Sequence, residues 1–174
     1  MRVRSHLAVV AIACGGCAAT PVPIEVPAQL KPAAGESRSA TLAARGVQIY
    51  ECRARKDAPG AFEWAFVAPE AELFDAGGTR VGRHFAGPRW ESNDGSRVVG
   101  TVKERADAPA PGAIPWLLLS TKPEGPEGAF SKVTSIQRVN TAGGAAPAAS
   151  CPSDQAGARQ RVPYTADYVF FVAR

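Results

Sequence analysis

Histidine is scarce in this chain of 174 residues, and its scarcity limits the chemistry that the chain can perform. There are two histidines, and His6 lies in an N-terminal segment that we expect to be removed, which leaves His84 alone. A zinc site takes three or four ligands from His, Cys and carboxylates at characteristic spacings. No such spacing surrounds His84, so the sequence predicts no metal site.

Two glycine motifs are also missing. No Gly-x-Gly-x-x-Gly opens a helix after a strand, and no Gly-x-x-x-x-Gly-Lys-Ser/Thr is present. These motifs place backbone N–H groups against phosphates, so we expect neither a nucleotide cofactor nor any other cofactor. The formal charge of +4 falls to +2 without Arg2 and Arg4, and the longest basic run is RARK at 53–56. This balance predicts no nucleic-acid partner.

A long hydrophobic run is absent, which argues against a membrane-spanning helix. Arg2 and Arg4 precede a short apolar run, Leu7 to Ala13, that ends in small residues. A bilayer span takes about 20 apolar residues, so residues 1–17 are typical of an export signal. Cys14 and Cys17 each follow a small residue, as the acylated cysteine of a lipoprotein does. Either is a candidate lipidation site, and simple cleavage with release is the alternative.

The two remaining cysteines, Cys52 and Cys151, form an even pair in a chain bound for an oxidising compartment. A disulfide is the expected state of such a pair. A metal or a catalytic thiol lacks partners, because no Cys-x-x-Cys occurs after the signal.

The chain then divides into a tether and one folded domain. Residues 18–45 are rich in Pro and Ala, with Pro21, Pro23, Pro27 and Pro32, and predict a stiff, extended tether. Residues 46–174 are enough for one hydrophobic core, so we expect a single domain there.

Short apolar or alternating runs, broken by Gly, Pro, Asp and Asn, dominate this domain and predict strands. The segment 131–139 has helical spacing, but its Val, Thr, Ser and Ile content favours a strand. We expect an all-β fold: an antiparallel β-sandwich or small β-barrel of about eight strands with long loops. The expected strands are 46–54, 62–67, 71–74, 81–85, 97–104, 115–121, 133–140 and 168–172.

The stretch VGRHFAGPRWESNDGSRVVG, residues 81–100, gathers the candidate functional side chains. Gly82 and His84 share one face of a strand, so the glycine could leave space for a ligand beside the imidazole. Trp90 has polar neighbours, which predicts partial exposure, whereas Trp116 precedes three leucines and is expected in the core. We take His84, Trp90 and Trp116 as candidate ligand-binding residues, and if His84 and Trp90 line one pocket they could stack on a sugar or another flat ligand.

Catalysis by the same stretch is the alternative. His84 with Asp94 or Glu91 would make an acid–base pair, and Ser96 would complete a Ser-His-Asp set. Ser96 lies in a turn, however, and no Gly-x-Ser-x-Gly elbow exposes it. The NDGS sequence at 93–96 is better explained as a hairpin with a type I′ turn, because Asp-Gly is a favoured pair there. We therefore assign no catalytic residue.

Several segments together resemble a known family. GVQIYEC, GRHFAGPRWESNDGSRVVG, IPWLLL, IQRVNTAGGAAPAASC and VPYTADYVFF occur in order. They are similar to segments of the secreted family catalogued as domain of unknown function 3455, over residues 28–174. The resemblance implies an exported bacterial protein with relatives in fungi, and it implies no activity.

Three functions remain after these exclusions. The first is a non-enzymatic exported domain, periplasmic or anchored to the outer membrane by a lipid, that binds a small ligand, a glycan or another envelope component. The second is a hydrolase-type enzyme using His84 with a nearby carboxylate. The third is a purely structural surface protein. A membrane is expected as a partner only through a lipid anchor.

Overall fold

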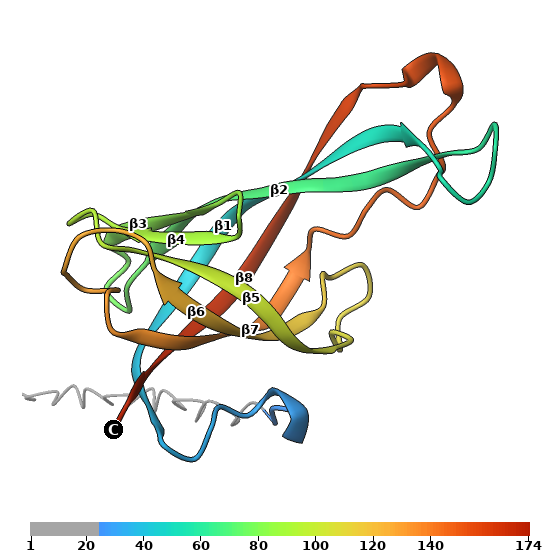
Figure 1. Cartoon of the computed structure of the whole chain (residues 1–174). Coiled ribbons are helices and arrows are strands. Elements are labelled where there is room, and N and C mark those ends of the chain that lie inside the picture. The colour runs from blue at the N-terminus through green and yellow to red at the C-terminus, as the bar shows by residue number, and fades with distance from the viewer. Residues whose placement is uncertain (1–24) are drawn as a thin grey trace, which may run out of the picture.

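The computed structural model describes residues 25–174, almost all of them in strands and their connections (Figure 1). The predicted export signal and the cysteines Cys14 and Cys17 lie outside the described residues. Within residues 25–174, no helix has the length and apolarity needed to cross a membrane. The elements are η1 (Ala28–Leu30), β1 (Glu36–Ala54), β2 (Phe62–Phe74), β3 (Arg80–Phe85), β4 (Arg89–Ser92), β5 (Arg97–Ala106), β6 (Trp116–Pro123), β7 (Val133–Gly143), η2 (Ser153–Gln155) and β8 (Arg159–Ala173).

The eight strands pair antiparallel in sequence order, and β1 pairs with β8 to close one sheet into a ring. This confirms the expected all-β class and selects the barrel over the sandwich. The ring is uneven, because β4 has 4 residues whereas β1 has 19. A closed sheet has an inside and an outside, so alternate residues of each strand face a common interior.

Strands β1, β2 and β8 run beyond the ring as an arm, seen at the upper right of Figure 1. Pro69 of β2 and Pro163 of β8 lie in this arm. At these positions β2 and β8 still pair with β1, but their other neighbours, β3 and β7 respectively, no longer pair with them. Proline lacks an N–H and fits such edge positions. The prediction of separate strands at 62–67 and 71–74 was therefore wrong: β2 is continuous through Pro69.

The first strand begins at Glu36, earlier than the expected domain start at residue 46. Its early part is rich in Ser and Ala, which are weak strand formers, so the alternation there gave little signal. Leu30 of η1 is 0% exposed and packs with Trp116, Leu118 and Val139. The side-chain amide of Gln137 also donates to the Leu30 carbonyl. Much of the segment expected as a tether thus belongs to the fold.

Two hydrophobic clusters lie on opposite sides of the sheet. The main cluster fills the ring and includes Leu73, Trp90, Ile136 and Phe170. The second lies outside it, between β6 and β7 and the chain around Leu30. Both faces of β6 are covered, which explains its continuous apolar sequence at 116–119.

The hairpin between β4 and β5 confirms the NDGS turn but not its expected type. Gly95 has φ +85°, whereas Asn140 is the only non-glycine with positive φ in the described chain. A type I′ turn would need positive φ at Asp94 as well. The Gly95 amide donates to the Ser92 carbonyl, and the Ser92 amide donates to the Ser96 carbonyl. This is a type I turn followed by a glycine bulge.

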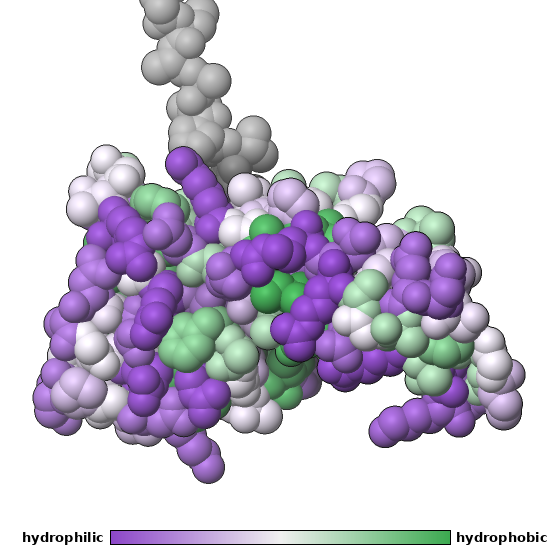
Figure 2. Space-filling view, turned by 90° about the horizontal axis from the view of Figure 1, so that it is seen from above, coloured by the Kyte–Doolittle hydropathy of each residue, from purple (hydrophilic) through white to green (hydrophobic). Residues whose placement is uncertain are grey.

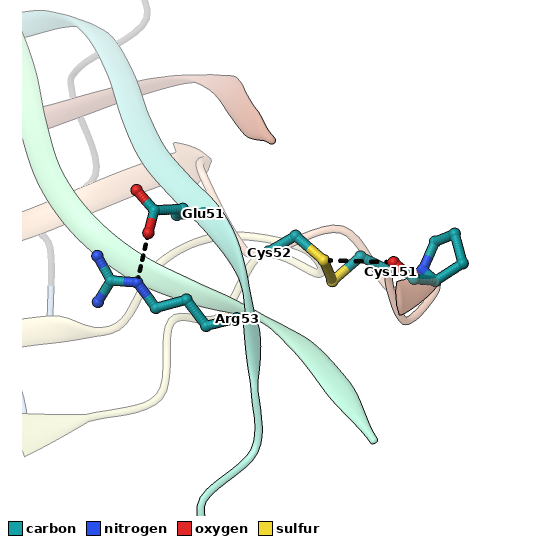
Figure 3. Close-up of a disulfide and its surroundings, with 5 residues drawn as sticks. Glu51, Cys52, Arg53 and Cys151 are labelled. Carbon is teal, nitrogen blue, oxygen red and sulfur yellow. Dashed lines mark hydrogen bonds and ion pairs between the residues drawn. A yellow bond between two sulfur atoms is a disulfide. The ribbon is translucent and has the colours of Figure 1, made fainter. Parts of the chain in front are cut away.

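The expected disulfide is present. Cys52 of β1 is bonded to Cys151, with the two Cα atoms 5.9 Å apart and a sequence separation of 99 (Figure 3). Cys151 lies in the connection that leads through η2 to β8. The bond therefore ties that connection to the arm, beside the Glu51–Arg53 ion pair.

Removing this disulfide should lower stability substantially. On the chain-entropy account, closing a loop of about 100 residues contributes roughly 4–5 kcal/mol. The Cys52→Ser/Cys151→Ser variant should show a loss approaching that size in urea unfolding, with a larger m-value because the denatured chain without the cross-link is more expanded. Exported wild-type protein should carry no modifiable thiol at either position, and finding two would contradict the assignment.

Shortening Leu30 should destabilise the whole domain, because its side chain is fully buried outside the ring. We expect Leu30→Ala to cost about 2–5 kcal/mol in the free energy of unfolding. An unchanged midpoint for Leu30→Ala would mean that the segment before β1 is a tether after all.

Candidate functional site

A cavity of about 640 Å³ opens into the ring beside the arm. Every strand contributes to its walls. The lining residues are Gln48 and Tyr50 of β1, Phe66, Val67 and Pro69 of β2, His84 of β3, Gly87 and Pro88 of the β3–β4 turn, Trp90 of β4, Val102 and Arg105 of β5, Ile114 and Pro115 before β6, Leu117 and Leu119 of β6, Arg138 of β7 and Tyr168 of β8. In Figure 2, hydrophobic side chains gather near the middle of the face seen from above, with hydrophilic ones around them.

The structure brings His84 and Trp90 together at this cavity. They are directly opposite in the β3–β4 register, and residues so paired have side chains on the same face. Their rings stack with centroids 4.3 Å apart and planes 14° apart. The Tyr168 ring packs edge-on against both, with centroids at 5.0 Å and 5.4 Å.

His84 is a neutral, buried imidazole. Its side chain is 2% exposed, and Nδ1 lies 2.8 Å from the Arg89 carbonyl, which can only accept, so Nδ1 carries the proton. Burial, opposed by the hydrogen bond to the Arg89 carbonyl and aided by the positive charge of Arg138, lowers the pKa of His84 to about 3. No carboxylate hydrogen-bonds to this ring among residues 25–174.

Trp90 is 1% exposed, so the expectation of partial exposure was wrong. Its polar neighbours Arg89 and Glu91 occupy the outer face, because side chains alternate along a strand. Gly100 makes room for the indole: a Cβ there would lie 2.7 Å from Trp90 Cζ3 and 3.2 Å from Leu119 Cδ2.

The sequence position of Gly82 suggested that it leaves space for a ligand beside His84, but it does not. A Cβ on Gly82 would lie 2.4 Å from the Glu91 carbonyl oxygen. The glycine instead allows close approach of the β4 backbone.

Trp116 is buried, as expected, but on the other side of the sheet. It packs against Leu30 and Val139 outside the ring and does not line the cavity. The neighbouring Leu117 and Leu119 face inward, so the alternation of β6 separates Trp116 from Trp90.

Asp94 and Ser96 form a structural link between two loops. Asp94 Oδ1 accepts from Ser96 N at 2.9 Å and from Ser96 Oγ at 2.6 Å, and Oδ2 accepts from Ala129 N at 2.8 Å. Ser96 Oγ in turn accepts from Phe130 N at 3.0 Å. The hydrogen bond from Ser96, with those from the two backbone amides, lowers the pKa of Asp94 to about 2. These contacts leave the proposed Ser-His-Asp set unassembled.

Glu91 is held on the outer surface by two arginines. Its oxygens lie 2.6 Å from Arg83 Nη2 and 2.9 Å from Arg97 Nη1. The pairing with Arg83 and Arg97 on the outer face keeps this carboxylate away from the imidazole. The structure therefore assembles neither acid–base pair that the hydrolase alternative requires.

Sequence reasoning missed several residues that line the cavity, above all Gln48, Tyr168 and Arg138. Gln48 is 2% exposed although its type is usually on the surface. The alternation GVQIYEC placed Gln48 on the same face as Tyr50, which was an available signal. The orientation of Arg138 was hidden, because register shifts occur on both sides of it in β7.

Two buried donors on the cavity wall have no hydrogen-bond partner in the described structure: Gln48 Nε2 and Trp90 Nε1. An unpaired buried donor costs about 1–3 kcal/mol. Within residues 25–174, no cluster of three or more His, Cys, Asp or Glu has the arrangement of a metal site.

Comparison with known proteins gives one match. The sequence model of the family described as "Protein of unknown function (DUF3455)" matches residues 32–172, which confirms the resemblance. Neither the curated proteins nor the solved structures contain a significant match to the chain.

The buried state of His84 predicts a loss of stability in mild acid. The folded imidazole binds its proton near pH 3, whereas in the unfolded chain it binds near pH 6.5, so below pH 6.5 the unfolded state takes up the proton first. The free energy of unfolding should be highest above pH 6.5 and fall by up to about 1.4 kcal/mol per pH unit toward pH 5.

His84→Phe keeps an aromatic ring against Trp90 but cannot titrate. Urea unfolding between pH 7 and pH 5 should therefore show a flatter pH profile for this variant than for the wild type. An NMR titration in which the folded wild-type imidazole ionises near pH 6.5 would contradict the prediction.

Proposed function

We propose that this chain, which belongs to the family described as "Protein of unknown function (DUF3455)", is a non-enzymatic binding protein that holds a small, largely apolar molecule inside its β-ring. The observation behind the proposal is the cavity of about 640 Å³ beside the His84–Trp90 stack. Small-molecule sites of about 300–1,000 Å³ usually combine apolar walls with a few polar groups.

The composition of the walls supports this function. Val102, Leu117 and Leu119 supply aliphatic surface, and Phe66 and Tyr50 supply aromatic surface at the arm. The Phe66 side chain is 53% exposed although it is large and apolar, and its ring lies edge-on to Tyr50 with centroids 5.9 Å apart. A ligand in the cavity would cover this surface and gain from its removal from water.

A glycan suits the cavity less well than an apolar molecule. Sugar recognition uses an open aromatic face with many polar partners around it. One face of Trp90 is instead covered by His84, and both rings are almost fully buried. The exposed aromatic surface belongs to Phe66.

Catalysis is not favoured by any contact at the site. His84 donates to a backbone carbonyl, and the two carboxylates near it in sequence are engaged elsewhere. General acid–base chemistry takes a group whose pKa lies near the working pH. An imidazole with a pKa of about 3 stays neutral there.

We further propose that the protein acts outside the cytoplasm. Two observations are compatible with export: the Cys52–Cys151 disulfide, and the lack, within residues 25–174, of a helix long and apolar enough to cross a membrane. With a lipid on Cys14 or Cys17, the chain to Val26 would reach at most about 45 Å. Val26 packs against the outer cluster, so an anchored domain would stay close to its membrane.

Binding is tested with the uncharged fluorescent probe N-phenyl-1-naphthylamine. The wild type should bind one equivalent with enhanced probe fluorescence, and Phe66→Ala should weaken binding by about tenfold through lost aromatic contact. Trp90→Ala is unsuitable, because removing a buried tryptophan costs about 3–5 kcal/mol and tests folding as well.

Phe85→Ala is the matched control, because Phe85 lies under Arg83 on the outer surface and does not line the cavity. It should leave the probe affinity unchanged. Absence of saturable binding to folded wild-type protein would overturn the proposal and favour a purely structural role.

A further inference from the structure

The polar groups of the cavity point to the class of molecule it takes, and this inference rests on the proposed binding function. Arg105, Leu117, Arg138 and Tyr168 are directly opposite one another across β5, β6, β7 and β8. Side chains paired in this way face the same side of the sheet. The two arginines are two strands apart, so their Cα atoms are separated by about 10 Å, and both border the same cavity.

Neither arginine has an acidic partner in the part of the chain that the structure describes. Eight other arginines are ion-paired there: Arg53, Arg55, Arg80, Arg83, Arg89, Arg97, Arg159 and Arg161. No Asp or Glu lines the cavity. Arg38, Arg45 and Arg174 have no ion pair in the described chain either, but they lie outside the cavity, so Arg105 and Arg138 are the arginines that face this space without a counter-charge.

Arg138 is held in place by the protein itself. Its Nε donates to the Pro115 carbonyl at 3.0 Å, and its side chain is half-buried. Its charge reaches the cavity walls: burial raises the pKa of Tyr50 and of Tyr168, and the Arg138 charge opposes the rise at both. Anchoring through Nε leaves the terminal nitrogens of the guanidinium for a second partner.

The uncharged polar groups of the cavity are also mainly donors. Gln48 Nε2 and Trp90 Nε1 are buried donors without acceptors, and the Tyr50 hydroxyl already donates to the Gly144 carbonyl at 2.6 Å. A cavity that is bordered by two arginines and by no carboxylate selects for a molecule that carries negative charge and acceptor oxygens.

We propose that the cavity binds an amphipathic organic carboxylate, with its apolar body against Leu117, Leu119 and Phe66 and its carboxylate between Arg105 and Arg138. The arginine fork matches the geometry of a carboxylate and can donate two parallel hydrogen bonds to it. The apolar walls exclude a small inorganic anion as the full occupant, because it would leave most of the volume unfilled.

Competition against N-phenyl-1-naphthylamine separates this inference from the proposed function. Dodecanoate and dodecan-1-ol share one alkyl chain and differ in charge. Dodecanoate, below its aggregation concentration, should displace the probe about ten- to a hundredfold more effectively than the alcohol, which is the usual gain from a charge-assisted contact.

Arg105→Gln and Arg138→Gln should each weaken displacement by dodecanoate far more than displacement by dodecan-1-ol, and so remove most of that preference. Arg138→Lys should retain part of it. Arg105 is exposed, so its variant should fold even if a change at Arg138 disturbs β7. Arg38→Gln is the matched control, because it removes the same charge from an exposed position of β1 outside the cavity.

Probe binding with equal displacement by acid and alcohol, or a preference that survives both glutamine variants, would overturn the carboxylate assignment and leave the binding function standing. If Arg38→Gln lost as much of the preference as Arg105→Gln, the preference would come from the net charge of the protein rather than from the cavity, and the carboxylate assignment would also be overturned. Failure of every probe to bind would overturn both proposals.

Discussion

The pairing of β1 with β8 is the constraint on which the rest of this structure depends. It joins the first and last strands from Glu36–Ala173 to Glu51–Arg159 and turns one sheet into a ring. Without it, the inward faces of eight strands would have no common interior, and both edge strands would carry unpaired backbone groups. The 99-residue disulfide loop acts at the arm end of the same pairing, through Cys52 of β1 and the connection that enters β8.

The uneven lengths of the strands explain why this ring holds a cavity rather than a filled core. Where β3 and β4 end, β1, β2 and β8 continue, so the side chains of Gln48, Tyr50 and Phe66 extend the wall without an opposing strand to fill the space. The rest of the interior is closely packed by Leu73, Ile136 and Phe170. The exposed aromatic surface of Phe66 lies at the open part, whereas the unmatched donors of Gln48 and Trp90 are buried in the wall. A fold optimised only for stability would pair or remove such groups.

Much of the fold followed from local patterns. Alternation and turn residues predicted the all-β class and most strands, because a half-buried strand repeats every two residues. The same rule failed where the covering of a strand was not local. Ala40 and Leu42 lie in a strand whose early part looks like a tether, and Pro69 interrupts the pattern of β2 without ending it. Trp90 was expected near solvent because its neighbours are polar, although those neighbours face outward.

The sequence by itself determined the composition of the molecule: strands of alternating polarity, one isolated histidine, an even cysteine pair after the predicted signal, and the family to which the chain belongs. It did not determine which side chains meet. Register shifts at Val133–Ser135 and Val139–Ala142 decide that Arg138 faces Tyr168 and the cavity, and ring closure decides that Gln48 and Trp90 border the same cavity. Only the tertiary structure decides these contacts, because they depend on long-range pairing between strands, whereas local periodicity fixes no more than the alternation within one strand.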